Sequence, residues 1–124
     1  MAKQRETRIR AQTRKKLWAM SGNRCAFPGC PETLVRDATE TDAEAVIGVE
    51  SHIVSGQKGG PRYDPSFPSS EVDRYANLIL LCSNHSRVVD GQQREYTASC
   101  LREMKAKHED GVARPMSEAD APPQ

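Results

Sequence analysis

The chain has 124 residues, a net charge of +1 and an apolar fraction of only 36%, values typical of one small domain with a small core. Such cores are often stabilised by disulfides or by a metal ion. The sequence has no apolar run near the roughly 20 residues that span a bilayer and no secretion signal at its N-terminus, so we expect a cytoplasmic protein that does not contact a membrane.

The N-terminal part is basic and helical in composition. Basic residues dominate positions 3–24, where Glu6 is the only acidic residue. This stretch gains an apolar end, formed by Leu17, Trp18 and Met20. Gly22 is typical of a helix C-terminus, and we assign residues 1–16 to a basic arm. The charge suits nucleic acid, although a solvated helix face explains it equally well.

A cysteine-containing turn and two strands follow the basic helix. Cys25 and Cys30 bracket a compact turn that contains Pro and Gly. Residues 45–54 have the branched apolar side chains of a strand, and residues 77–81 form a second such run. Between them, residues 55–70 are rich in Gly, Pro and Ser. A loop of this length is usually functional or disordered.

The remaining sequence predicts two helices and a tail. One helix should begin near Ser83, and an amphipathic helix over residues 96–110 should end at Gly111. Residues 111–124 are acidic and Pro-rich, as disordered tails are. These elements predict an α+β fold, with its folded domain over residues 17–110.

Two pairs of metal-ligand residues flank the central structure. Cys25 and Cys30 are separated by four residues, and Cys82 and His85 by two. Zinc prefers four thiolate and imidazole ligands, which small folds often supply as two closely spaced pairs. We therefore predict a structural zinc. The alternatives are ordinary buried cysteines with a surface histidine, or Cys100 as the fourth ligand, although Cys100 lies in the apolar stripe of the last helix.

A second group of polar residues lies between the two pairs. His52 stands near the end of the first strand, and Asn77 opens the second. Together with "ESHIVSGQKGGPRYDP", "NLILLCSNH", "RVVD", "CAFPGC" and "YTASCLREMKAKHE", they give a pattern that resembles the zinc-containing branch of the HNH endonuclease family. The resemblance covers Leu17 to Glu109. It implies a small zinc-stapled ββα-metal domain with an N-terminal basic helix and a C-terminal helix.

The resemblance also implies roles for individual residues. His52 matches the general base that takes a proton from the attacking water, and Asn77 matches the asparagine that orients this base. The residues that match the family's structural zinc ligands are Cys25, Cys30, Cys82 and His85. His108 and Glu109 match the closing helix, where they are structural. The implied activity is metal-dependent endonucleolytic hydrolysis of double-stranded DNA, and the family leads us to expect a bacterial or phage origin.

Two positions depart from the family pattern. The ligands of the catalytic Mg²⁺ or Mn²⁺ ion should lie at positions 51 and 86, where this chain has Ser51 and Ser86. Hydroxyls are poor substitutes for imidazole or carboxylate. Glu50 shares a strand face with His52, and Asp90 follows Ser86 by one helical turn, so a site of Glu50, Ser86 and Asp90 is a plausible replacement. The alternative is that Glu50 is solvated and Asp90 ends its helix or pairs with Arg87 or Arg94.

The basic residues that we expect to contact phosphates are Arg10, Arg14, Lys15, Lys16, Lys58, Arg62 and Arg87. Two other functions stay open. A catalytically silent HNH-like zinc module that only binds nucleic acid is favoured by the two serines. A zinc-stabilised protein-interaction adaptor is a weaker alternative, because it explains neither the Gly-rich loop nor the basic arm.

Overall fold

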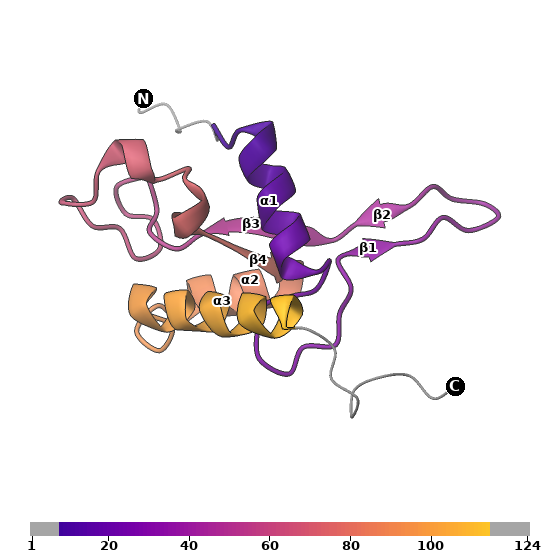
Figure 1. The fold of residues 1–124 in the computed structure, drawn as a ribbon. Helices are drawn as coiled ribbons and strands as arrows, with labels where there is room; N and C mark the ends of the chain where they lie inside the picture. The colour runs from indigo at the N-terminus through magenta and orange to yellow at the C-terminus, as the bar shows by residue number, and fades with distance from the viewer. Residues whose placement is uncertain (1–7, 115–124) are drawn as a thin grey trace.

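The computed structural model describes residues 8–114 (Figure 1). The helices of this part are α1 (Ala11–Ser21), α2 (Ser83–Gly91) and α3 (Ala98–Ala113). Its strands are β1 (Val35–Arg36), β2 (Ala45–Val46), β3 (Gly48–His52) and β4 (Leu78–Cys82). Two 3₁₀ turns, Ser69–Glu71 and Tyr75–Asn77, precede β4. The prediction of a small α+β fold is confirmed.

The strands form two separate antiparallel pairs. In the central pair, Gly48 of β3 lies opposite Cys82 of β4, and His52 lies opposite Leu78. The β1–β2 pair belongs to a hairpin that extends away from the helices (Figure 1). The single strand expected over residues 45–54 is therefore two strands. The break falls at Ile47, whose N–H donates to a carbonyl of the hairpin while its own carbonyl accepts from the start of α2.

The hydrophobic core is built around β4. Its five residues are all buried, so this strand is covered on both faces. The other large side chains with almost no exposed surface are Leu17, Leu34, Ile53, Val89 and Leu101. Each such burial contributes about 1.5–3 kcal/mol. The core therefore joins α1, α2 and α3 to the central strand pair.

The helix ends follow local sequence signals, with one exception. Gly22 ends α1 in the left-handed conformation, at φ 63°, as expected. Thr97 begins α3 by accepting a hydrogen bond from the Cys100 N–H. Gly111 was expected to end this helix, but α3 continues to Ala113 because the Arg114 N–H still donates to the Asp110 carbonyl. Of the expected tail, residues 115–124 lie outside the described part.

Gly48 marks the closest approach of α1 to the central strands. A Cβ at this position would lie 2.6 Å from the Trp18 ring and 3.1 Å from the Leu34 side chain. We expect Gly48→Ala to lower the free energy of unfolding by about 1–3 kcal/mol, because the site has no room for a methyl group. Urea unfolding measures this change.

Gly91 provides the matched control. It ends α2, and a Cβ there would meet no atom within 4 Å. Gly91→Ala should therefore be neutral or stabilising by up to about 1 kcal/mol, because alanine has the higher helix propensity. Equal unfolding midpoints for the two variants would contradict the packing described for Gly48.

Candidate functional site

Four metal-ligand residues converge at one end of the central strands. The ligand atoms of Cys25, Cys30, Cys82 and His85 all lie within 4.8 Å of one another. All four cysteines of the chain are free thiols, and Cys100 is not part of this group. The sequence prediction that these four residues come close enough to hold a metal ion is confirmed.

The turn that contains Cys25 and Cys30 is tied directly to β4. The Ala26 N–H donates to the Leu80 carbonyl at 3.0 Å, which brings Cys25 beside the end of the strand. The Cys30 N–H donates to the Phe27 carbonyl, and Gly29 takes a φ of 79° that closes the turn. The thiols of Cys25 and Cys30 thereby lie close to each other.

The second pair is positioned by the start of α2. Cys82 is the N-cap residue of this helix, and its Sγ accepts a hydrogen bond from the His85 N–H. His85 Nδ1 lies 3.2 Å from Cys82 Sγ and 3.7 Å from Cys25 Sγ. The Phe27 ring stacks on the His85 imidazole, with centroids 4.0 Å apart and planes at 1°, and so fixes its orientation.

The protonation of its thiols decides the charge of this group. Burial raises the pKa of the Cys25 thiol to about 12, and the neighbouring Cys82 thiol also raises it. Without a metal ion, Cys25 therefore keeps its proton at neutral pH. Three thiols and one imidazole at this spacing are the donor set that suits tetrahedral zinc.

His52 forms a second candidate site at the opposite end of β3 from the metal group. Its Nε2 lies 2.8 Å from Asp73 Oδ1, and the two side chains are 23% and 12% exposed. Asp73 also accepts a hydrogen bond from the Arg8 N–H. A carboxylate on one ring nitrogen fixes the tautomer and leaves the other nitrogen as the base. Asp73 was not identified from the sequence.

Asn77 holds the backbone next to His52. Its buried side chain accepts from the Val54 N–H and donates to the carbonyls of Val54 and Val72. Val54 follows His52 by two residues, and Val72 directly precedes Asp73. Asn77 therefore fixes the two chain segments that carry His52 and Asp73, and the catalytic orienting role expected for it stays a prediction.

The two serines at the expected catalytic-metal positions contact each other. Ser51 Oγ and Ser86 Oγ lie 2.9 Å apart, and both residues are buried. This contact joins β3 to α2. The side chain of Ser51 thus points toward α2, on the face of β3 opposite to Glu50 and His52.

Glu50 points toward α1 instead. Its carboxylate accepts hydrogen bonds from Arg14 Nε at 2.7 and 2.8 Å and from Trp18 Nε1 at 2.9 Å. Only 16% of its side chain is exposed. The structure therefore does not bring Glu50 to Ser86, and the solvated alternative for Glu50 does not hold either.

Asp90 pairs with Arg62 of the Gly-rich loop. Arg62 Nη2 donates to Asp90 Oδ1 at 2.7 Å. The same guanidinium donates to the backbone carbonyls of Ile53 and Val89 at 2.6 and 2.9 Å, and its side chain is only 4% exposed. Arg62 is thus a structural residue in this arrangement and does not present its charge to a phosphate, contrary to the expected binding role.

The residues proposed for a catalytic divalent ion do not fit such an ion. Ser51 and Ser86 offer neutral hydroxyls that are already hydrogen-bonded, and the two carboxylates of Glu50 and Asp90 are each paired with an arginine. Hard divalent cations need several oxygen ligands with net negative charge. The cysteine and histidine group is the only cluster of three or more His, Cys, Asp or Glu ligands found within residues 8–114.

The other basic residues expected to bind phosphates lie at the surface. They are Arg10, Lys15, Lys16, Lys58 and Arg87. Lys16 also lies over the Tyr75 ring, 4.2 Å from its centroid, and Arg14 shares its charge with Glu50. These side chains come from α1, the Gly-rich loop and α2. The available positive charge is therefore spread over three elements.

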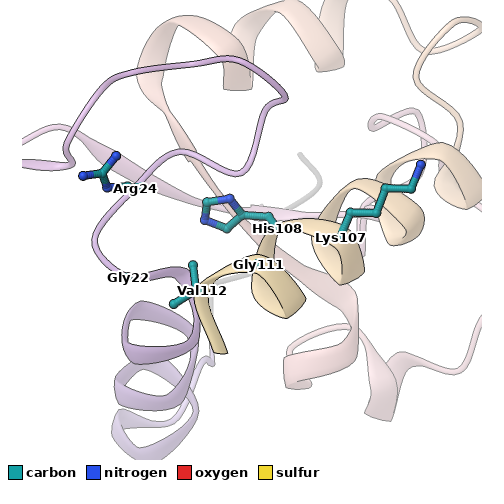
Figure 2. A pocket seen from close by; sticks show the side chains of 6 residues that line it. All are labelled: Gly22, Arg24, Lys107, His108, Gly111 and Val112. Atoms are coloured by element: carbon teal, nitrogen blue, oxygen red, sulfur yellow. The ribbon is translucent and has the colours of Figure 1, made fainter. Parts of the chain in front are cut away.

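An open groove lies where the ends of α1 and α3 meet (Figure 2). It is lined by Gly22, Arg24, Lys107, His108, Gly111 and Val112. His108 Nε2 donates to the Ser21 carbonyl at 2.8 Å and so holds α3 against the end of α1. His108 is structural, as expected, and no predicted catalytic or metal-binding residue lines this groove.

Comparison with protein-family models and with curated proteins gives no match to this sequence. Within residues 8–114, no helix has the length and apolar character needed to cross a membrane. The function of this chain is therefore inferred from its residues and their geometry.

Cys30 and Cys100 are both half-buried, but only Cys30 belongs to the metal group. Serine variants of the two therefore distinguish loss of a ligand from loss of packing. We expect Cys30→Ser to lose most of the bound metal and to melt at a lower temperature, because the site keeps only three strong ligands. Cys100→Ser should keep its metal, since Cys100 is outside the cluster. Elemental analysis and thermal unfolding of both variants measure this, and equal metal contents would contradict the assignment.

The raised pKa of Cys25 predicts how metal affinity depends on pH. In the metal-free fold, burial raises the pKa of the Cys25 thiol from 9.0 to about 12, so the folded protein holds this proton more tightly than the unfolded chain does. The free energy of unfolding therefore falls as the pH rises from about 9 to about 12. A metal ion must displace the proton. Between pH 6 and 8 the apparent zinc affinity should rise about tenfold per pH unit for each proton released, as measured by chelator competition. A flat profile would contradict this.

Proposed function

We propose that this chain is a zinc-stabilised endonuclease of the HNH kind, in which His52 is the general base for hydrolysis of a phosphodiester bond in DNA. The observation that carries the proposal is the pairing of His52 Nε2 with Asp73 Oδ1 at 2.8 Å. A base for proton transfer needs this kind of orientation. His52 is also half-buried rather than fully enclosed, so a substrate can approach it.

The order of the elements supports the same proposal. The antiparallel β3–β4 pair is followed directly by α2, and the loop between the strands carries the Gly-rich segment. His52 ends β3, Asn77 lies directly before β4, and the metal-ligand pair lies at the start of α2. This is the sequence of features that the ββα-metal fold of the family would require.

We assign zinc to the Cys25, Cys30, Cys82 and His85 group. The support is the donor set and its spacing. The ion would join the N-terminal turn to the end of β4 and the start of α2. Its proposed role is structural, because all four positions around the ion would be filled by protein atoms.

The chemistry assigned to the chain is one proton transfer. With Nε2 donating to Asp73, His52 Nδ1 would take a proton from water as the water oxygen bonds to phosphorus. The bond from phosphorus to the leaving sugar oxygen breaks, and this oxygen takes a proton from solvent. Asp73 would stabilise the imidazolium that forms. A catalytic Mg²⁺ or Mn²⁺ would stabilise developing charge in the family's mechanism, but the residues here do not fit one, and no step is assigned to it.

DNA would meet the protein through its phosphates. The exposed positive side chains that support this proposal are Arg10, Lys15, Lys16, Lys58 and Arg87. Contacts of this kind do not depend on base sequence and weaken as salt rises.

A second candidate function is a catalytically silent module that binds nucleic acid. The specific observation in its favour is the hydrogen bond between Ser51 and Ser86, which places two neutral side chains where the family's pattern requires metal ligands. Retention of the His52–Asp73 pair argues against it, because a module that only binds needs no oriented base.

Nicking of supercoiled plasmid separates the two functions. We expect His52→Ala and Asp73→Asn to lower the rate by about 10²-fold or more, because each removes the oriented base. Reactions with EDTA, Mg²⁺ or Mn²⁺ should be run in parallel, together with DNA binding measured by fluorescence anisotropy.

His108→Ala is the matched control, since His108 is half-buried but bonds to the backbone of α1. It should keep its cleavage rate where it remains folded. If wild-type protein binds DNA without cutting it under any of these conditions, the silent module is the correct function. If His52→Ala cuts as fast as wild type, the assignment of the base is wrong.

A further inference from the structure

The side-chain oxygens where β3 contacts α2 belong to Ser51 and Ser86, and they are hydrogen-bonded to each other. Ser51 and Ser86 are 6% and 8% exposed, and their hydroxyls satisfy each other at 2.9 Å. Among the described residues, every buried side-chain nitrogen or oxygen has a hydrogen-bond partner. A cation at this position would have to break the serine pair and would gain only neutral oxygens in return.

A positive charge already lies beside this serine pair. Asp90 follows Ser86 by one turn of α2, and its carboxylate accepts from the Arg62 guanidinium at 2.7 Å. The same Nη2 lies 3.4 Å from the His52 carbonyl, so the guanidinium sits between the end of β3 and α2. A divalent ion bound to Asp90 would have to displace this guanidinium or lie beside its permanent charge, which opposes binding.

We infer that the contact between β3 and α2 formed by Ser51, Ser86 and Asp90 binds no divalent cation, and that the Arg62 guanidinium supplies the positive charge at Asp90. Two independent contacts carry this inference, the Ser51–Ser86 hydrogen bond and the Arg62–Asp90 ion pair. It goes beyond the proposed function, because it concerns cation binding whether or not the chain cuts DNA.

The same geometry makes the surface a latent metal site. Ser51 and Ser86 approach each other from two elements, and Asp90 lies on the same side of α2 as Ser86. Aspartate at position 51 and histidine at position 86 would add a carboxylate and an imidazole next to the carboxylate of Asp90. The added carboxylate and imidazole are ligands that Mn²⁺ accepts, and the added negative charge would offset the positive charge of Arg62.

Titration with Mn²⁺ tests the inference on the full-length protein loaded with zinc. Isothermal calorimetry and the loss of the free Mn²⁺ electron paramagnetic resonance signal report binding without reference to activity. We expect no stoichiometric site in the wild-type protein and one equivalent in Ser51→Asp/Ser86→His. The control Ser51→Ala/Ser86→Ala, which removes the serine pair without adding ligands, should bind none.

Two results would overturn the inference. One is a stoichiometric Mn²⁺ site in the wild-type protein that Asp90→Asn abolishes, because the ion would then lie on this surface. The other is a folded Ser51→Asp/Ser86→His variant that binds no Mn²⁺, because the serine pair would then not be what excludes the cation. If circular dichroism shows that the double variant is unfolded, the single variant Ser86→His replaces it. It is titrated with Mn²⁺ by the same two methods and judged by the same outcomes.

Discussion

The alternation of side chains along β3 decides what each polar residue near its end can do. Successive residues of a strand point to opposite faces, so Glu50 and His52 share one face while Ser51 takes the other. The first face meets α1 and the segment that carries Asp73, and the second meets α2. A charged pair therefore forms on one side and a neutral hydroxyl pair on the other. The proposed base, His52, and the expected metal position are thus separated by the strand itself, and Glu50 cannot replace Ser51 as a ligand without a shift in register.

This arrangement requires that β3 and the loop after it be held in place, and polar contacts at both ends of the strand pair contribute to this. At one end of the strand pair, the cysteine and histidine group joins the turn at Cys25 to the start of α2. At the other end, Asn77 and Arg62 bond to backbone carbonyls around the Gly-rich loop. A buried guanidinium is costly unless its donors are satisfied, and here it meets a carboxylate and several carbonyls. Each polar contact therefore substitutes for apolar packing that a chain of this composition lacks.

The sequence predicted the residues whose spacing is local and missed the partners that come from distant segments. The four metal ligands were predicted because two close pairs have few other uses. The buried strand at residues 78–82 was predicted from its continuous run of aliphatic residues. Asp73 was missed because it lies in an irregular segment 21 residues from His52, where no periodicity marks it. The only signal in the sequence is that Asp73 is an acidic residue four positions before Asn77. Arg62 was misread for a similar reason, since an arginine in a Gly-rich loop looks exposed until the loop folds back over it.

The C-terminal helix belongs to the same site because it supports the segment between Asp73 and Asn77. Tyr75 lies between these two residues, and its hydroxyl donates to Glu109 of α3. Lys105 of α3 lies 3.5 Å from the centre of the Tyr75 ring and also pairs with Glu109. Burial raises the pKa of the Tyr75 hydroxyl, and Glu109 raises it further, while burial lowers the pKa of Lys105. The tyrosine therefore stays neutral and keeps its proton for Glu109. Because Asp73 and Asn77 flank this anchored ring, displacement of α3 would move the carboxylate that pairs with His52 and the amide that holds the neighbouring backbone, although α3 itself does not contact His52 in any of these bonds.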